Sequence, residues 1–226
     1  MVDSRNLDQN RRRDLEIIAG IVKDGDKVLD LGCGDGSFLR SLKEDKGAQV
    51  LGIEIDQDSI VRCIGNGVPV IQRDLNDELD FIPDQAFDLA VLSHTLQETR
   101  RPDLLLSSIV RIGKRAAVSV INFGHWRCRL QVAFSGRMPR SSQMPFQWYD
   151  TPNIHFCTLR DFQELCASLG IRIVEMQPVA AKFPRLSKWF PNLFAVGCVF
   201  ILEYSTNSPL AAFEPPIRPI RPVRHV

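Results

Sequence analysis

Short apolar runs alternate along the chain with segments whose apolar residues recur at helical spacing. The first such segment is residues 14–22, where Leu15, Ile18 and Val22 stand at i, i+3 and i+7 and predict a helix with one buried stripe. The apolar runs between the helical segments have the length and flanking turn residues of buried strands. Seven strands are predicted, at residues 27–31, 50–55, 68–71, 87–92, 116–121, 171–176 and 194–202.

Local start and stop signals define the helices between these strands. Asp56 is placed to cap one helix, and Gly65 and Gly67 mark its end. A Thr158-x-x-Asp161 pattern resembles a capping box ahead of residues 162–169, and further helices are expected at residues 37–46 and 102–112. Strands that alternate with helices predict an α/β fold: a seven-stranded, mostly parallel sheet with helices on both faces. We expect residues 1–204 to form one domain.

Two stretches depart from this alternation. Residues 124–156, the insert, stand where a short connection would suffice, and they are rich in aromatic residues, Arg and Pro. A short amphipathic helix is expected in the insert, from apolar residues at helical spacing: Trp126, Leu130, Ala133 and Phe134. Three interpretations of the insert are open: a lid over a ligand, a protein interface, or part of the core. As core it would bury four aromatic residues: Trp126, Phe134, Phe146 and Trp148. Residues 205–226, with the near-repeat IRPIRPVR, predict an extended mobile tail, or alternatively a ligand for a polyproline-binding domain.

Composition narrows the classes of function. The 28 Lys+Arg and 27 Asp+Glu residues leave a net charge of +1, which disfavours a nucleic-acid partner because phosphate contacts need a basic surface. The first residues lack the apolar stretch of a signal peptide, and the longest apolar run is too short to span a bilayer. The six cysteines are scattered without a Cys-x-x-Cys pair, which favours reduced thiols over a disulfide or zinc framework. We therefore expect a cytoplasmic protein with no membrane partner and no metal.

The most informative run is residues 28–39, VLDLGCGDGSFL, in which a strand precedes and a helix follows three alternating glycines: Gly32, Gly34 and Gly36. This arrangement, with Cys33 inside the loop, points backbone N–H groups at a polar or anionic ligand. Ser37 stands where the dinucleotide-binding fingerprint needs Gly or Ala, which disfavours a nicotinamide or flavin cofactor. Three glycines alone are weak support for any ligand.

Acidic residues at three successive strand ends strengthen the prediction of a ligand site. Asp30 ends the first strand and is placed to accept from an ammonium group, while Glu54 ends the second strand, where a carboxylate binds ribose hydroxyls. Asp74 follows the third strand and is placed to accept from an adenine amine. An ammonium group, a ribose and an adenine together describe S-adenosylmethionine; the alternative is that these acids cap helices or are solvated. Ile55, Leu75 and Ser93 complete the predicted cofactor-binding set.

With these residues the sequence resembles the class I S-adenosylmethionine-dependent methyltransferases over about residues 14–122, and thus implies their Rossmann-like fold. It resembles more narrowly the MetW family of methionine-biosynthesis proteins, through these segments: VLDLGCGDG, GIEID, LSHTLQETRRP, NFGHWRCRLQ and MPFQWYDTPNIHFCTLRDF. The resemblance implies S-adenosylmethionine or S-adenosylhomocysteine as the ligand. It also implies a role beside a homoserine O-acyltransferase, MetX, as a partner or regulatory subunit.

Methyl transfer is the alternative function, with a small molecule as the acceptor. The weak candidates for a catalytic base are His94, Tyr149 and His155, although His94 is equally consistent with packing or capping and His155 with the core. The residues after the fourth strand read Ser-His-Thr-Leu, which differs from the Asn-Pro-Pro-Tyr pattern of amino-group methylation, and no Pro-Cys pair is present for cytosine C5 methylation. Transfer to RNA or protein is disfavoured by the near-neutral charge.

Overall fold

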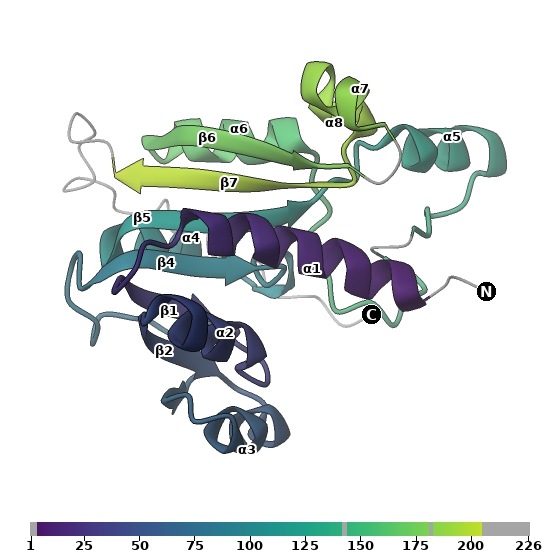
Figure 1. The fold of residues 1–226 in the computed structure, drawn as a ribbon. Coiled ribbons are helices and arrows are strands. Elements are labelled where there is room, and N and C mark those ends of the chain that lie inside the picture. Colours follow the sequence, from purple (N-terminus) through teal and green to yellow (C-terminus); the bar gives the residue numbers. More distant parts are fainter. Residues whose placement is uncertain (1–3, 142–143, 181–182, 205–226) are drawn as a thin grey trace, which may run out of the picture.

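The computed structural model describes residues 4–141, 144–180 and 183–204, with side chains from Arg13 onward (Figure 1). The predicted mobile tail at 205–226 lies outside the described residues. No helix in these described ranges is long and apolar enough to cross a membrane.

A seven-stranded sheet forms the centre of the fold, with strand order β3-β2-β1-β4-β5-β7-β6. Every strand pair is parallel except the two made by β7, which is antiparallel to β5 and to β6. The strands are β1 Lys27–Leu31, β2 Gln49–Glu54, β3 Val70–Gln72, β4 Phe87–Ser93, β5 Gly113–Ile121, β6 Ile171–Val179 and β7 Gly197–Tyr204. The predicted seven-stranded, mostly parallel sheet is therefore confirmed.

Helices cover both faces of the sheet (Figure 1). They are α1 Ser4–Ile21, α2 Ser37–Lys46, α3 Gln57–Gly65, the short 3₁₀ helix η1 Leu96–Glu98, α4 Pro102–Ile112, α5 Trp126–Ser135, α6 Leu159–Ser168, α7 Pro184–Trp189 and α8 Pro191–Phe194. One hydrophobic cluster joins the sheet to α1, α2 and α3, and a second joins the opposite face to α4 and α6. In β1, Val28 belongs to the first cluster and Leu29 and Leu31 to the second. Because both faces are buried, the strands are continuous apolar runs in the sequence.

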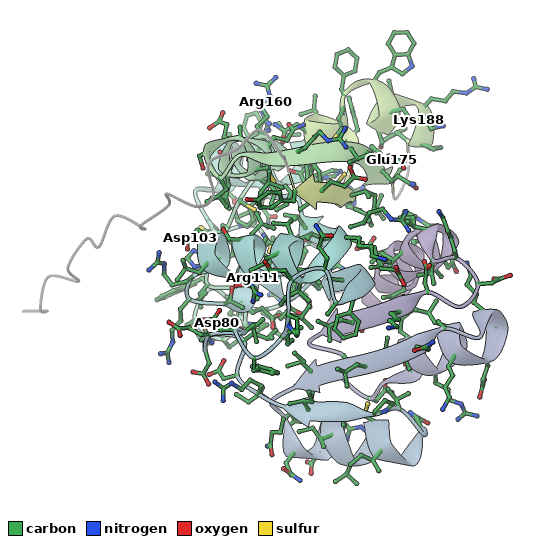
Figure 2. The ribbon with its side chains drawn as sticks, turned by 90° about the vertical axis from the view of Figure 1, so that its left-hand side faces the viewer. Asp80, Asp103, Arg111, Arg160, Glu175 and Lys188 are labelled. Atoms are coloured by element: carbon green, nitrogen blue, oxygen red, sulfur yellow. The ribbon has the colours of Figure 1, made fainter. Side chains whose placement is uncertain are left out.

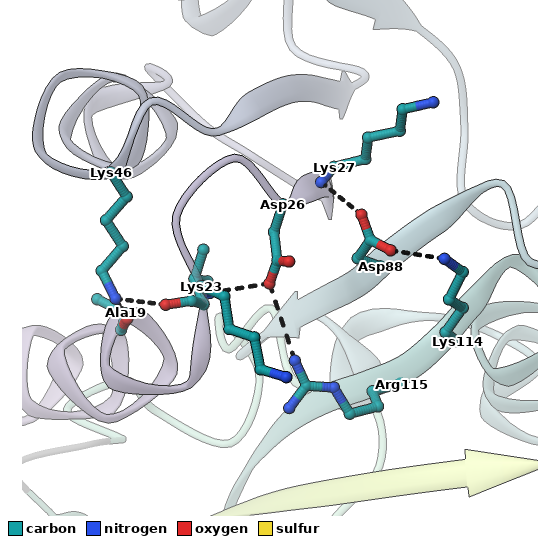
Figure 3. Close-up of polar contacts among 9 residues, drawn as sticks. Ala19, Lys23, Asp26, Lys27, Lys46, Asp88, Lys114 and Arg115 are labelled. Carbon is teal, nitrogen blue, oxygen red and sulfur yellow. Dashed lines mark hydrogen bonds and ion pairs between the residues drawn. The ribbon is translucent and has the colours of Figure 1, made fainter.

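Charged side chains link the amino-terminal ends of neighbouring strands in the sheet (Figure 3). Asp88, at the start of β4, accepts from the backbone N–H of Lys27 at 2.9 Å and from Lys114 Nζ at 2.8 Å, which ties three neighbouring strands together. On the α4 side of the molecule (Figure 2), Arg111 donates to the carbonyl oxygens of Ile82 and Leu79 and so fixes the segment before β4. These contacts stabilise the end of the sheet that lies opposite to the carboxyl ends of β1 and β4.

Several observed elements differ from the predicted ones in their bounds; β5, for example, begins at Gly113 and β6 extends to Val179. α1 begins at Ser4, whereas the helix was predicted only from residue 14. β3 covers Val70–Gln72 instead of the predicted residues 68–71. The strand predicted at 194–202 begins only at Gly197, because Pro191 opens the one-turn helix α8, which ends at Phe194. Proline at the first helical position favours a helix start, and this outweighed the apolar run. α2 and α4 have the predicted bounds.

The capping box of α6 gives a stability prediction. Thr158 Oγ1 accepts from the backbone N–H of Asp161 at 3.3 Å, and Asp161 Oδ2 accepts from the backbone N–H of Thr158 at 2.8 Å. Thr158→Ala removes one of these bonds and is expected to lower the free energy of unfolding by about 1 kcal/mol in urea titrations. Thr158→Ser keeps the hydroxyl and serves as the control; equal stability of the two variants would contradict the prediction.

Candidate functional site

The candidate site lies where the strand order reverses, between the carboxyl ends of β1 and β4. In open α/β sheets ligands bind at such a reversal, because the loops after the two strands diverge and leave a crevice. Here the glycine loop, residues 32–36, follows β1 and leads into α2. The N–H groups of Gly32 and Cys33 donate to the carbonyl oxygen of Ile53, at 2.8 and 3.1 Å, and thereby tie the loop to β2.

Two glycines in this loop are required by close contacts as well as by backbone conformation. Gly32 has a φ of +82°, and a Cβ atom there would lie 2.6 Å from Thr95 Oγ1 in the segment after β4. Gly36 has a φ of +73°, and its Cβ would lie 2.6 Å from the sulfur of Cys63 in α3. A larger residue at Gly32 would push the β1 and β4 loops apart, so this glycine sets the width of the crevice.

A cavity of about 610 Å³ opens beside the glycine loop. Five of the predicted cofactor-binding residues line it: Asp30, Gly32, Cys33, Gly34 and Ser93. Its other lining residues were not predicted from the sequence: Leu15 of α1, Phe38 of α2, and Ser59 and Arg62 of α3, together with Asp35 and Ser37 at the loop. Helical periodicity predicted these helices, but nothing in it indicated which of their residues face the loop.

Glu54, at the end of β2, is held by three backbone groups. Its Oε2 accepts from the N–H of Gly34 at 2.8 Å, and its Oε1 accepts from the N–H groups of Ile55 and Asp56 at 2.8 and 3.0 Å. The carboxylate therefore fixes the position of the glycine loop and lies beside the cavity rather than in its lining. The side chain of Ile55 next to it is 56% exposed.

The third predicted acid, Asp74, is not part of the lining of this cavity. Asp74 Oδ1 accepts from the backbone N–H and the side-chain amide of Asn76, at 2.9 and 2.8 Å, and so caps the turn after β3. Leu75 lines a separate cavity of about 720 Å³ beside α4. The structure thus brings together the residues after β1 and β4, whereas Gly36, Glu54, Ile55, Asp74 and Leu75 lie outside the lining of the 610 Å³ cavity.

Negative charge is concentrated around the glycine loop. Burial and then the Asp30 carboxylate raise the pKa of the Cys33 thiol, with smaller contributions from Cys63 and Glu54. Burial also raises the pKa of Cys63, and the charges of Asp35, Asp30 and Glu54 act in the same direction. Both thiols therefore stay protonated, which agrees with the interpretation of Cys33 as a small packing residue. These carboxylates attract a cationic ligand, and Arg62 adds one positive charge to the lining of the same cavity.

The segment after β4 carries His94 next to the cavity-lining Ser93. His94 has a backbone φ of +59°, uncommon for a residue other than glycine, and its N–H donates to Ser119 Oγ at 3.0 Å. Its Nε2 lies 2.8 Å from Oδ2 of Asp14, a fully buried residue of α1. The sequence analysis missed Asp14. The available signal was its position four residues before Ile18, on the buried stripe of the first helix.

The other two catalytic candidates lie in the insert and do not line the cavity. Tyr149 is 71% exposed and packs edge-on against Trp148. His155 is held through its backbone, because its N–H donates to the carbonyl oxygen of Gln97 and its carbonyl accepts from Gln97 Nε2. None of the three candidates therefore lines the cavity, and His94 is the one that directly follows a lining residue, Ser93.

The insert forms the expected helix, α5, but the predicted apolar face of that helix is not buried. Leu130 is 45% exposed and Phe134 85% exposed, and Trp148, later in the insert, is 72% exposed. The interpretation of the insert as core is therefore wrong for Phe134, Trp148 and Phe146, which is 42% exposed, while Trp126 is partly buried. Helical spacing identified a face of apolar residues, but only the tertiary arrangement determined that no described element covers it.

The pKa shift at Cys33 gives a second prediction. Iodoacetamide is expected to alkylate Cys33 in the folded protein roughly tenfold or more slowly than in the urea-unfolded chain at pH 8, because the thiolate is the reacting form. Raising the pH from about 7 to 9 should accelerate only the unfolded reaction. Peptide mass spectrometry gives both rates; equal rates would show that burial and Asp30 do not suppress ionisation of the thiol.

Comparisons with known proteins place the chain in a family. The family "Methionine biosynthesis protein MetW" matches residues 12–202. The bifunctional methionine biosynthesis protein MetXA/MetW of Rhodopirellula baltica is 32% identical over 171 residues, which are 72% of this chain and 27% of that protein. Ajmaline N-methyltransferase of Rauvolfia serpentina is 24% identical over 66% of this chain and 53% of its own length. The chain thus spans about half or less of these relatives.

Solved structures show the same fold at low sequence identity. A SAM-dependent methyltransferase from Archaeoglobus fulgidus superposes with a TM-score of 0.63 at 20% identity, over 85% of this chain and 91% of its own. Magnesium protoporphyrin IX methyltransferase from Synechocystis, with bound SAH, gives a TM-score of 0.64 at 13% identity, over 89% and 86% of the two chains. The chain therefore belongs to the MetW family of methionine biosynthesis proteins and has the fold of the S-adenosylmethionine-dependent methyltransferases.

Proposed function

We propose that this protein binds S-adenosylmethionine at the glycine loop and acts in methionine synthesis as the partner, or regulatory subunit, of a homoserine O-acyltransferase. The observation that carries the proposal is the Rhodopirellula relative, whose printed name joins MetXA and MetW in one protein. Two activities joined in one chain are held at a fixed, short distance, as they are in a complex. The proposal transfers that association to two separate chains.

The chemistry of the cavity supports S-adenosylmethionine as the ligand. The carboxylates that raise the pKa of Cys33 and Cys63 favour a positively charged molecule, and S-adenosylmethionine carries an ammonium and a sulfonium. Asp30, which is 4% exposed, would accept from the ammonium group. Glu54 would accept from the ribose hydroxyls, in exchange for one of its backbone bonds. Asp74, after release of Asn76, would accept from the adenine amine.

An exposed aromatic surface supports the partner role. We define the aromatic surface as Phe134, Trp148, Tyr149, Trp189 and Phe190, whose exposed fractions run from 58% to 85%. The helices that carry or flank these residues, α5, α7 and α8, project from one end of the sheet (Figure 1), and residues of α5 and of the later insert line a common cavity. Exposed Trp, Tyr and Phe are typical of the centre of protein interfaces, because they bury a large area at low entropic cost.

A buried residue shortly after β4 holds the insert in place. Gln97, in η1 shortly after His94, is 3% exposed, and its carbonyl oxygen accepts from the N–H groups of Ile154 and His155 at 3.0 Å. Its side chain accepts from the N–H of Ile121 at 2.8 Å. A ligand that shifts the loop after β4 would therefore also act on the insert. Regulation requires that the ligand bind the free and the partner-bound states with different affinity.

Removal of the Glu54 carboxylate tests the ligand assignment. Glu54→Ala is expected to weaken S-adenosylhomocysteine binding by about 1–3 kcal/mol, because ribose hydroxyls lose a charged acceptor and Gly34 loses its anchor. Isothermal titration calorimetry measures the affinity. Glu44→Ala, on the exposed face of α2 where Glu44 pairs with Arg40, is the matched control and should bind as the wild type does. An unchanged affinity in Glu54→Ala would remove Glu54 from the site.

The partner role is tested by the activity of the cognate acyltransferase. Addition of this protein is expected to raise the acyltransferase rate, and titrated S-adenosylmethionine is expected to lower the rate again. Trp148→Ala should lose the stimulation while its affinity for S-adenosylmethionine is kept, whereas Phe81→Ala, which removes a half-exposed aromatic residue outside the insert, should stimulate normally. Absence of any effect by the wild type, under conditions where the ligand binds, would refute the partner role.

A further inference from the structure

Positive charge is concentrated at the end of the molecule that carries the aromatic surface. The insert has four arginines and one acidic residue, Asp150, while α7 and α8 add Arg185 and Lys188 and no acidic residue. Because the whole chain has a net charge of only +1, the rest of it is net negative. Figure 2 shows Arg160 and Lys188 at this end, apart from Asp80, which lies beside α4.

The basic side chains at this end have no acidic partner. The arginines of the insert and of the first turn of α6 are all exposed: Arg127, Arg129, Arg137, Arg140 and Arg160. None of them forms an ion pair with a carboxylate in the described ranges, whereas six arginines elsewhere in those ranges do. Their charge is therefore available to an anionic partner from outside the chain.

Two of these arginines line a cavity together with two residues of the aromatic surface. The α8 cavity, as we name it, has a volume of about 360 Å³ and is lined by Arg129 of α5, Arg160 of α6, Trp189 and Phe190 among others. Its described lining includes no acidic residue. Asp161, which follows Arg160 in the chain, is engaged in the capping box of α6. The α8 cavity thus combines two cations with large apolar rings.

The same combination occurs a second time in the insert. The insert cavity, of about 740 Å³, is lined by Arg137 and Arg140 together with Met138, Phe146 and Trp148. Its described lining again includes no acidic residue, although the cavities at the glycine loop and beside α4 both contain several. Two neighbouring segments of this end therefore provide the same chemistry: a pair of arginines beside exposed aromatic rings.

Bonds within the chain fix two of the arginines before any partner binds. Arg129 Nε donates to the carbonyl oxygen of Gly124 at 2.6 Å, and Arg140 donates through Nε and Nη2 to the carbonyl oxygen of Pro145 at 3.1 and 2.8 Å. Neither Nη group of Arg129 has an acceptor among the residues that the structure describes. A guanidinium held in this way presents a fixed pair of donors, which matches the two oxygens of a carboxylate.

We propose that the acyltransferase binds this end of the molecule through an acidic face. Carboxylates of that face enter the α8 cavity and the insert cavity, and its apolar side chains cover the exposed rings of Trp148 and Trp189. This inference rests on the proposed partner role and specifies the surface that the partner must present. Arginine and tryptophan contribute most to binding where they lie together at the centre of an interface.

The shape and fixed donors of this end favour a folded protein over a lipid bilayer or a nucleic acid. A bilayer surface is flat on this scale and does not fill two cavities. Nucleic-acid bases stack on aromatic rings, but the half-exposed Met138 beside Arg137 is typical of protein interfaces. Donors that the chain already holds in place suit carboxylates that are equally fixed, because less conformational entropy is lost on binding.

The affinity of the full chain for the cognate acyltransferase tests the acidic face. Biolayer interferometry measures the Kd at about 50 and 500 mM NaCl, and the wild type is expected to bind about tenfold or more weakly at the higher salt concentration. Arg129→Gln/Arg160→Gln should raise the Kd at low salt by about tenfold or more and reduce its salt dependence. Arg160→Gln alone should give a smaller change in the same direction, and its side chain has no hydrogen-bond partner within the described part of the chain that folding could need.

A matched variant removes two charges from the opposite end of the sheet. Lys23 and Lys27 are exposed near the amino-terminal ends of β1 and β4 (Figure 3). Lys23→Gln/Lys27→Gln should therefore bind the acyltransferase as the wild type does. Thermal unfolding of every variant verifies that it is folded. Equal affinities of the two double variants, or a wild-type Kd that does not depend on salt, would overturn the acidic face.

The remaining outcomes separate this inference from the proposed function. If Arg129→Gln/Arg160→Gln stimulates the acyltransferase with an unchanged affinity, the acidic face is refuted and the partner role stands. If the wild type neither binds nor stimulates the acyltransferase, the partner role fails and this inference fails with it. Arginine-dependent binding to phosphatidylcholine–phosphatidylglycerol vesicles or to a single-stranded RNA oligonucleotide, without an acyltransferase complex, would assign this end to a membrane or to RNA instead.

Discussion

The contact between Gly32 and Thr95 is the constraint on which the site depends. It lies where the loops after β1 and β4 meet, at the reversal of strand order, and a Cβ atom on Gly32 would approach Thr95 Oγ1 to 2.6 Å. Because the two loops approach each other there, Asp30 of β1, Cys33 of the glycine loop and Ser93 of β4 line one cavity. The absence of a side chain at Gly32 thus allows the segments after β1 and β4 to pack closely, and it also allows a ligand to approach the backbone of the loop.

Charge and burial act together around this contact. The carboxylates at the glycine loop lie close to buried thiols, whose pKa values rise, and Asp14 is buried entirely beside His94. Acidic groups in such surroundings carry a desolvation cost that a cationic partner offsets. Asp14 Oδ2 lies 2.8 Å from His94 Nε2, and we propose that the ammonium and sulfonium of the ligand lie among the acids around the glycine loop. The helix α1 therefore contributes both a wall of the cavity, through Leu15, and a buried negative group, Asp14.

The aromatic surface and the cavity are separate features, and Gln97 stands in the chain between the cavity-lining Ser93 and the insert. This buried side chain bonds β5 and the insert at once, shortly after His94 in the chain. Membership of the MetW family gives the biosynthetic context. The geometry is consistent with a protein in which ligand binding at the loop and contact with a partner at the insert affect each other.

The sequence by itself determined the features that depend on neighbours a few residues away. The bounds of α2 and α4, the cap at Asp56 and the capping box at Thr158 follow from periodicity and side-chain bonds within one turn, and the glycine loop with Asp30 follows from one continuous motif. The antiparallel direction of β7, the exposure of Phe134 and the pairing of Asp14 with His94 were decided only by the tertiary structure. Each of these depends on which distant element packs against the residue, and the spacing of apolar positions within a single element does not contain that information.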